Sequence, residues 1–272
     1  MSVFLTASKN YTKNPDTSIF KMHTHNIYEI FCFLSGNAKY YIEGTIYNLK
    51  PNDILIINKF ESHSLLIKST APYERLVVNF NSEALLTENP NRLLNFIINK
   101  PLGINNLYSS STYRSTNWIY YLEKICSSYE LDVKRAYLTV LINELFEAHN
   151  KTDENKSKHT EINSIVQYIN DNLTNNISLE YVCNKFHFSK THLNRKFKEI
   201  VGTTVWEYIT TKRLYLAKEF LRNGIPPTTV YIKCGFNDYC TFYKSYKNKF
   251  GVSPKVDYKK LTTDPLQKHN FS

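Results

Sequence analysis

The chain contains no run of about 18 apolar residues, the length that a membrane-spanning helix requires. Its amino terminus lacks a basic segment followed by an apolar stretch, so no secretory signal peptide is indicated. CxxC pairs are absent, and the five cysteines are an odd number in hydrophobic surroundings, which argues against disulfides and a zinc site. We therefore expect a cytoplasmic protein without a membrane partner, in which the cysteines are buried free thiols.

Acidic residues are too few to balance the basic ones, and the imbalance is local. The net charge is +10, and residues 160–272 hold 17 lysines and arginines against 9 acids, whereas residues 1–159 hold 17 against 15. A basic segment of this kind is typical of nucleic-acid binding, because contacts to phosphates release counterions. A basic surface that only aids solubility is the alternative.

Length and local pattern predict two domains, which we place at residues 1–149 and 161–272. The segment 150–160, NKTDENKSKHT, is polar throughout and predicts a linker. Residues 20–80 contain six short β-type runs, residues 117–149 two amphipathic helices, and every segment after the linker has a helical pattern. The expected fold class is α+β: an amino-terminal β-barrel with two helices, followed by an all-α domain of about seven helices.

The second domain contains a weak internal repeat. Positions from Val182 onward match positions from Val230 onward at an offset of 48, and after one extra residue Ser189 matches Asp238 at an offset of 49. Each copy has a short helix, a tight turn and a second helix, with Ser189 and Asp238 placed to cap the second helix. The pattern predicts two helix-turn-helix units.

The second helix of the first copy, KTHLNRKFKEI, is expected to bury Leu193, Phe197 and Ile200. The opposite face would be polar and basic, with Lys190, Thr191, Asn194, Arg195 and Lys198. Such residues suit the major groove, because arginine can bond guanine, asparagine can bond adenine and a threonine methyl can contact thymine. Lysines nearby would hold phosphates.

The second copy, YCTFYKSYKNKF, is expected to bury Phe242 and Tyr246 and to discriminate bases less. Its outward face would carry Tyr239, Cys240, Tyr243, Lys244 and Lys247. A long amphipathic helix over residues 204–222 connects the copies and ends before Gly224. If both second helices lie on one face, they would enter successive major grooves about 34 Å apart.

With these elements, residues 177–258 resemble the AraC/XylS family of bacterial transcription regulators, through SLEYVCNKFHFSKTHLNRKFKEIVG, TKRLYLAKEFL and GFNDYCTFYKSYKNKFGVSPKVDY. The resemblance implies DNA contacts from the outward residues named above and from Arg213, the connector arginine. It also implies contact with RNA polymerase and a homodimer formed through the helices at 117–149. The alternative for these helices is that their apolar stripes only cover the barrel. Tyr231, Pro226 and Pro227 depart from the family pattern, so we expect the second unit to sit or bind atypically.

The amino-terminal half resembles a cupin barrel, through HxHxxxE at residues 23–29 and the run YNLKPNDILIINKFESH at 47–63. In cupins, two histidines, a carboxylate and a later histidine can converge on a divalent metal. The PxGxxH core of the second motif is not intact here, so we expect these side chains to bind an effector, with no metal and no cofactor. The predicted effector residues are His23, His25, Glu29, Tyr41, His63 and Arg75.

The favoured hypothesis is a DNA-binding transcription regulator that is not an enzyme, and family analogy favours an activator. A small molecule, such as a sugar or related metabolite, would bind in the barrel and reposition the two helix-turn-helix units on promoter DNA. The alternative is a metal-dependent cupin oxygenase or isomerase with a helical appendage. A third hypothesis is a regulator that no longer responds to an effector and uses the barrel for dimerisation.

Overall fold

The computed structural model describes residues 2–17, 20, 22–113, 116–151 and 161–262. They form two compact units: an amino-terminal unit that extends to Asn163 and includes Ile200–Gly202, and a carboxy-terminal unit that holds the rest of the chain after Asn163. Residues 152–160 of the expected linker lie outside the described part, so the predicted domain boundaries stay predictions. No described helix is both long enough and apolar enough to cross a membrane. The cysteines are free as expected, but Cys240 is exposed and Cys126 only partly buried.

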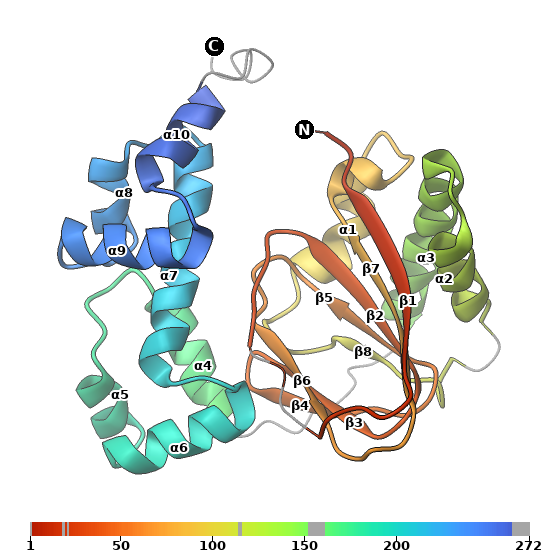
Figure 1. Cartoon of the computed structure of the whole chain (residues 1–272), viewed down its shortest axis with the longest axis horizontal. Helices are drawn as coiled ribbons and strands as arrows, with labels where there is room; N and C mark the ends of the chain where they lie inside the picture. The colour runs from red at the N-terminus through yellow and green to blue at the C-terminus, as the bar shows by residue number, and fades with distance from the viewer. Residues whose placement is uncertain (1, 18–19, 21, 114–115, 152–160, 263–272) are drawn as a thin grey trace. The chain divides into compact units, whose positions relative to one another are not determined.

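The amino-terminal unit contains two antiparallel sheets that pack face to face (Figure 1). One has five strands in the order β1-β7-β2-β5-β8, and the other has three in the order β4-β3-β6. The strands are β1 (Leu5–Thr12), β2 (Tyr28–Ser35), β3 (Ala38–Ile42), β4 (Thr45–Asn48), β5 (Asp53–Ile57), β6 (His63–Ile67), β7 (Tyr73–Phe80) and β8 (Leu107–Tyr108). Strands β2 to β7 correspond to the six predicted runs, whereas β1 and β8 were not predicted.

Both faces of the central strand β2 are buried, which explains its unbroken apolar run. Phe31 and Phe33 point toward the three-stranded sheet, and Ile30 and Cys32 point the other way, into a core shared with helices. Alternation of side chains along a strand separates the two cores. A strand that is covered on both sides therefore has no polar face in the sequence.

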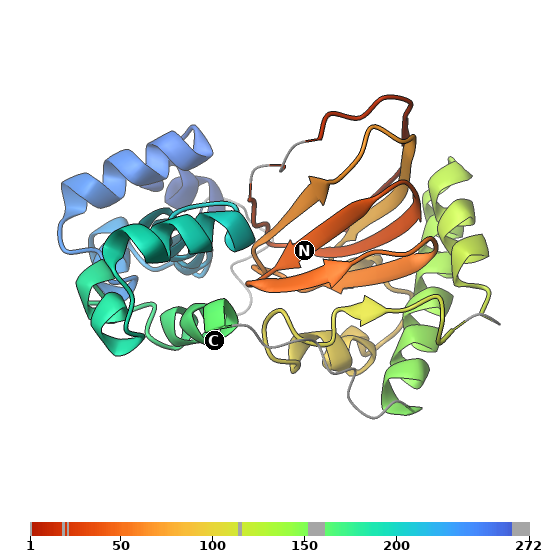
Figure 2. The same cartoon turned by 90° about the horizontal axis from the view of Figure 1, so that it is seen from below.

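The helices of this unit are α1 (Pro90–Ile98), α2 (Trp118–Ser127) and α3 (Leu131–Lys151). The predicted pair, α2 and α3, covers the outer face of the five-stranded sheet with its apolar stripes (Figure 2). Trp118 Nε1 and Tyr121 OH both donate hydrogen bonds of 3.0 Å to Glu144, which ties the two helices together. Helix α1 was not predicted.

The carboxy-terminal unit contains seven described helices, as the sequence predicts. They are α4 (Glu161–Asp171), α5 (Leu179–Lys185), α6 (Lys190–Val201), α7 (Val205–Arg222), α8 (Pro227–Lys233), α9 (Tyr239–Phe250) and α10 (Pro254–Thr262). Helices α5 and α8 have 7 residues each, and α6 and α9 have 12 each. The extra residue of the second copy lies in the turn between α8 and α9, which confirms the predicted repeat.

Both predicted caps are present. Ser189 Oγ accepts a hydrogen bond from His192 N at 3.3 Å, and Asp238 Oδ1 accepts one from Thr241 N at 2.7 Å. Each cap satisfies one of the backbone amides that the first turn of a helix leaves without a partner. The two turns also share a left-handed residue at the equivalent position, His187 with φ 56° and Gly235 with φ 80°.

Helix α7 connects the two copies and contributes to the core of each. It starts with a capping box formed by Thr204 and Glu207, and its 18 residues span about 27 Å. In its first turns the ring of Tyr208 packs against Phe197 of α6, while its second half shares a core with α8 and α9 (Figure 1). Pro227 occupies the first position of α8, where its missing N–H costs nothing, so the proline pair does not shorten that helix.

Candidate nucleic-acid interface and ligand-binding cluster

The outward face of α6 is basic, as predicted. Lys190, Thr191, Arg195 and Lys198 are exposed. The Arg195 side chain is 68% exposed, and Arg195 Nη1 lies 3.9 Å from a Glu199 carboxylate oxygen, which is a weak surface pair. The guanidinium can therefore reach a base edge without breaking a strong interaction. Leu193 and Phe197 are fully buried on the opposite side, whereas Ile200 is only partly buried.

Asn194 does not lie on this exposed face. Its side chain is partly buried, and Asn194 Oδ1 accepts a hydrogen bond of 3.3 Å from Val205 N, at the first residue of α7. The amide oxygen thus satisfies a backbone donor at the start of the connector helix. Asn194 is therefore less exposed than predicted, and its contact with DNA stays a prediction.

Arg213 is only 3% exposed, a position that does not favour the predicted DNA contact. Its Nε donates to Leu173 O at 2.8 Å and its Nη2 donates to Asn175 O at 2.7 Å, both in the connection between α4 and α5. A Cβ atom added at Gly235 would lie 3.0 Å from the guanidinium carbon. Arg213 therefore joins the first copy to the turn of the second copy.

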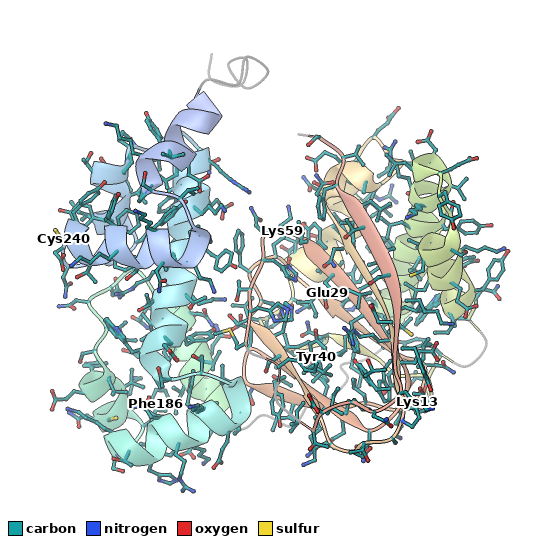
Figure 3. The ribbon with its side chains drawn as sticks, in the orientation of Figure 1. Lys13, Glu29, Tyr40, Lys59, Phe186 and Cys240 are labelled. Atoms are coloured by element: carbon teal, nitrogen blue, oxygen red, sulfur yellow. The ribbon has the colours of Figure 1, made fainter. Side chains whose placement is uncertain are left out.

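The outward face of α9 exposes fewer of the predicted side chains than expected. Tyr239 and Tyr243 are only partly exposed, and the Tyr239 ring packs against Tyr231 at 5.7 Å and Phe242 at 5.9 Å between centroids. Residues that remain exposed include Cys240, at the outer end of the helix in Figure 3, and Lys244, Lys247 and Asn248. Asn248 was not among the residues predicted for this face, although it lies one turn beyond Lys244 on the same side of the helix.

Four of the predicted effector residues meet at one end of the space between the two sheets. The nitrogen and oxygen atoms of His23, His25, Glu29 and His63 that could bind a metal all lie within 4.8 Å of one another. We call these four residues the His–Glu cluster. His23 and His63 form a backbone pair through two hydrogen bonds of 3.0 Å, which fixes two of the rings beside each other.

Glu29 is the central residue of the His–Glu cluster. Its Oε1 accepts a hydrogen bond of 3.1 Å from Tyr40 OH, and its Oε2 lies 3.1 Å from His25 Nε2 and 3.8 Å from His63 Nε2. Burial raises the pKa of Glu29, but the interaction with His25 and the other rings outweighs it and lowers the pKa to about 2. Burial lowers the pKa of His63 to about 4. At neutral pH a carboxylate therefore faces a neutral His63 ring.

The other two predicted effector residues do not join the cluster. Tyr41 lies on the opposite face of β3 from Tyr40, which packs inside between the sheets (Figure 3). The prediction was wrong by one residue, which reverses the face of a strand. Arg75 pairs with Phe33, four residues or about 13 Å along β7 from the position opposite Glu29, and its guanidinium lies 5.3 Å from the Tyr73 ring.

A second buried glutamate has a different environment. Glu61 forms an ion pair with Lys100 and accepts hydrogen bonds from Gly103 N, Asn58 N and Asn106 Nδ2 at 2.7–2.8 Å. All of its lone pairs have donors, so its role is structural.

A separate cavity of about 150 Å³ lies where β5 and β8 meet the start of α2. Tyr108, Ser110, Tyr113 and Trp118 are among its lining residues. The sequence did not predict it, because its wall combines residues near 52–54 with residues of 108–113 and 116–119, which are far from them in the chain. It is smaller than the ~300 Å³ of a typical small-molecule pocket.

Two family models match the chain: a helix-turn-helix domain over residues 182–259 and an AraC-like ligand binding domain over residues 11–89. The HTH-type transcriptional activator RhaS of Mannheimia succiniciproducens is 25% identical over 245 residues, covering 87% of this chain and 88% of that protein. The HTH-type transcriptional activator AarP of Providencia stuartii is 33% identical over 105 residues, covering 36% of this chain and 78% of that protein. A crystal structure of ToxT from Vibrio cholerae has a TM-score of 0.41 and 19% identity, covering 96% and 99% of the two chains.

Proposed function

Because the chain belongs to the AraC/XylS family of bacterial transcription regulators, we propose that it activates transcription by inserting α6 and α9 into successive major grooves of promoter DNA. The observation that carries the proposal is the duplication itself. Two helices of 12 residues, each with a side-chain cap, present basic side chains from one compact unit. The α7 connector between them is about 27 Å long, the same order as the ~34 Å that separates successive major grooves of B-form DNA.

The two helices would have unequal roles. On α6, Arg195 would read guanine, with a contribution of about 1–3 kcal/mol to base discrimination, and Lys190 and Lys198 would hold phosphates. On α9, Lys244 and Lys247 would hold phosphates, while the partly buried tyrosines limit the reading of bases. Affinity would then come from both units and sequence preference mainly from the first.

The amino-terminal unit would act as the sensor and the dimerisation module. A small molecule, such as a sugar or related metabolite, would bind beside the His–Glu cluster, where Asn79 Oδ1 is buried without a hydrogen-bond partner in the described part of the chain. A second copy of the chain would cover the apolar side chains that α2 and α3 leave exposed, among them Tyr120, Val133 and Val140. DNA as the partner implies action in the cytoplasm, with RNA polymerase as a further partner and no catalysis by the chain.

The proposal is tested with DNA fragments that the full-length protein selects from the source genome, by fluorescence anisotropy at fixed salt. We expect Arg195→Ala to weaken binding about 10- to 100-fold, equivalent to about 1–3 kcal/mol, and to relax the preference for guanine at one position. Arg92→Ala, which removes an exposed arginine from α1, is the matched control and should bind like the unaltered protein. Equal affinity of the two variants for the selected fragments contradicts the assignment of α6.

A further inference from the structure

We propose that the chain has a second small-molecule site, which binds an uncharged molecule with a single aromatic ring. The site is the cavity of about 150 Å³ where β5 and β8 meet the start of α2. We call it the aromatic cavity, and its wall includes Ile54, Tyr108, Ser110, Tyr113 and Trp118. This inference goes beyond the proposed function, which requires only one effector beside the His–Glu cluster.

The aromatic cavity and the His–Glu cluster lie on opposite faces of the five-stranded sheet. Ile54 and Tyr108 are paired on neighbouring strands and belong to the core that this sheet shares with the helices. Tyr40, whose hydroxyl donates to Glu29, belongs to the core between the two sheets. Glu29 points the same way as Phe31, two residues along β2. The sheet therefore separates a molecule in the cavity from one beside the cluster.

Three aromatic rings form one side of the cavity. The centroid of the Tyr113 ring lies 4.8 Å from that of Trp118 and 5.8 Å from that of Tyr108. Trp118 Nε1 donates to Glu144 at 3.0 Å, and Tyr108 OH lies 3.4 Å from His149 Nδ1. Because the polar atoms of these two rings already have partners, the rings offer a ligand mainly carbon surface. Aromatic rings attract one another at centroid distances of about 4.5–7 Å, so an added ring would extend this group.

No charged side chain lines the aromatic cavity in the part of the chain that the structure describes. Asp53 precedes Ile54 in β5, but its Oδ1 accepts a hydrogen bond from Ser110 N and its Oδ2 accepts one from Lys50 N, both at 2.8 Å. This carboxylate is buried and holds the wall of the cavity in place. A charged ligand would lose its hydration without gaining an opposite charge, so the cavity favours an uncharged molecule.

The distribution of polar groups orients the ligand. Asn52 is exposed and Ser110 is half-buried, whereas Ile54, Tyr108 and Trp118 are at most 4% exposed. A ring would therefore enter with its polar substituent toward Asn52 and Ser110. An apolar protein cavity of ~150 Å³ is large enough for benzene. The volume thus admits one six-membered ring with a small substituent, such as a hydroxyl group.

A bound ring would stabilise the start of α2. Trp118 is the first residue of this helix, and its bond to Glu144 also ties α2 to α3. A molecule that packs on the Trp118 ring would hold both helices more firmly on the sheet. Because it binds only the folded chain, it should raise the temperature of unfolding.

The test uses phenol as the probe and the full-length protein, in a titration followed by ligand-observed nuclear magnetic resonance. We expect a Kd on the order of 0.1–1 mM, since so small a molecule makes few contacts. Benzoate, which carries a charge, should bind at least ~10-fold more weakly. Cyclohexanol, which has the hydroxyl group but no aromatic ring, should bind about 2- to 10-fold more weakly.

Three variants locate the site. Ser110→Leu places a larger side chain in the wall and should abolish phenol binding. Tyr113→Ala removes one ring and should weaken binding about 2- to 10-fold. Thr112→Leu, the matched control, adds the same side chain at an exposed position outside the wall and should bind phenol like the unaltered protein.

Absence of phenol binding by the unaltered protein, or equal binding by Ser110→Leu and Thr112→Leu, overturns the site. If Ser110→Leu fails to fold, as judged by circular dichroism, the decision rests on Tyr113→Ala against Thr112→Leu, and equal affinities contradict the site. Binding that Glu29→Gln loses and Ser110→Leu keeps would place phenol beside the His–Glu cluster and reject the aromatic cavity. Equal affinity for phenol and benzoate would contradict the selection of uncharged molecules.

Discussion

The two helix-turn-helix units share their framework and differ in what they expose. Their helices have equal lengths and their caps occupy equivalent positions. Leu193 and Phe197 of α6 are fully buried, and so are Phe242 and Tyr246 at the equivalent places of α9. On the outside, α6 presents an exposed arginine in a weak surface pair, whereas α9 presents lysines beside tyrosines that pack inward. The constraint of packing has kept the interior of the two copies alike and left the surface free to diverge.

The difference suggests that the two units contribute differently to DNA binding. Arg213 joins the two copies, so a substitution there tests the connection between them. Arg213→Ala removes both hydrogen bonds to the connection between α4 and α5 and leaves two carbonyl groups without their donor. We expect a loss of about 1–3 kcal/mol in the free energy of unfolding for each carbonyl that water cannot reach. Chemical denaturation of the full chain measures it. Arg222→Ala, on the last turn of the same helix, is the control, and an equal effect of the two changes would contradict the role of Arg213.

Removal of one helix cap should lower the free energy of unfolding by less than the Arg213 substitution. It tests whether the turns of the two copies are equivalent. Ser189→Ala leaves the amide of His192 without its side-chain acceptor, and we expect a loss of about 1 kcal/mol in unfolding free energy. Ser189→Asp, which restores an acceptor of the kind found at the second copy, should recover the stability. Thermal denaturation measures both, and a failure of aspartate to recover stability would show that the two turns are not equivalent.

The smallest expected effect concerns the phosphate contacts of α9. Lys244→Ala should weaken binding to all DNA sequences by a similar factor and reduce the slope of log affinity against log salt by about 1. Arg195→Ala should instead change the ranking of sequences. A titration at several salt concentrations separates the two behaviours. If Lys244→Ala alters sequence preference as strongly as Arg195→Ala, the proposed division between the copies is wrong.

The sequence predicted what depends on neighbours along the chain. The repeat, the turn insertion and the caps at Ser189 and Asp238 are local signals, and the structure confirms them. The resemblance to a cupin barrel, through HxHxxxE and the later His63, implied that His23, His25, Glu29 and His63 would meet, and their donor atoms do lie within 4.8 Å of one another.

Features that depend on tertiary packing were not predictable in the same way. Asn194 and Arg213 lie on polar stretches of their helices, and only the folded chain shows that backbone groups of other segments take their hydrogen bonds. The choice between Tyr40 and Tyr41 depends on strand register, because β3 has apolar or aromatic residues on both faces. Strand β1 has mostly exposed residues at the edge of its sheet, so its sequence shows little apolar alternation.

The central claim is that α6 and α9 occupy neighbouring major grooves on one side of a DNA duplex. The most direct measurement is a footprint of the full-length protein on a selected genomic fragment, combined with interference by guanine methylation. The account predicts two protected major-groove segments one helical turn apart, with Arg195→Ala removing the interference in only one of them. A single protected segment, or two segments on opposite sides of the duplex, would contradict it.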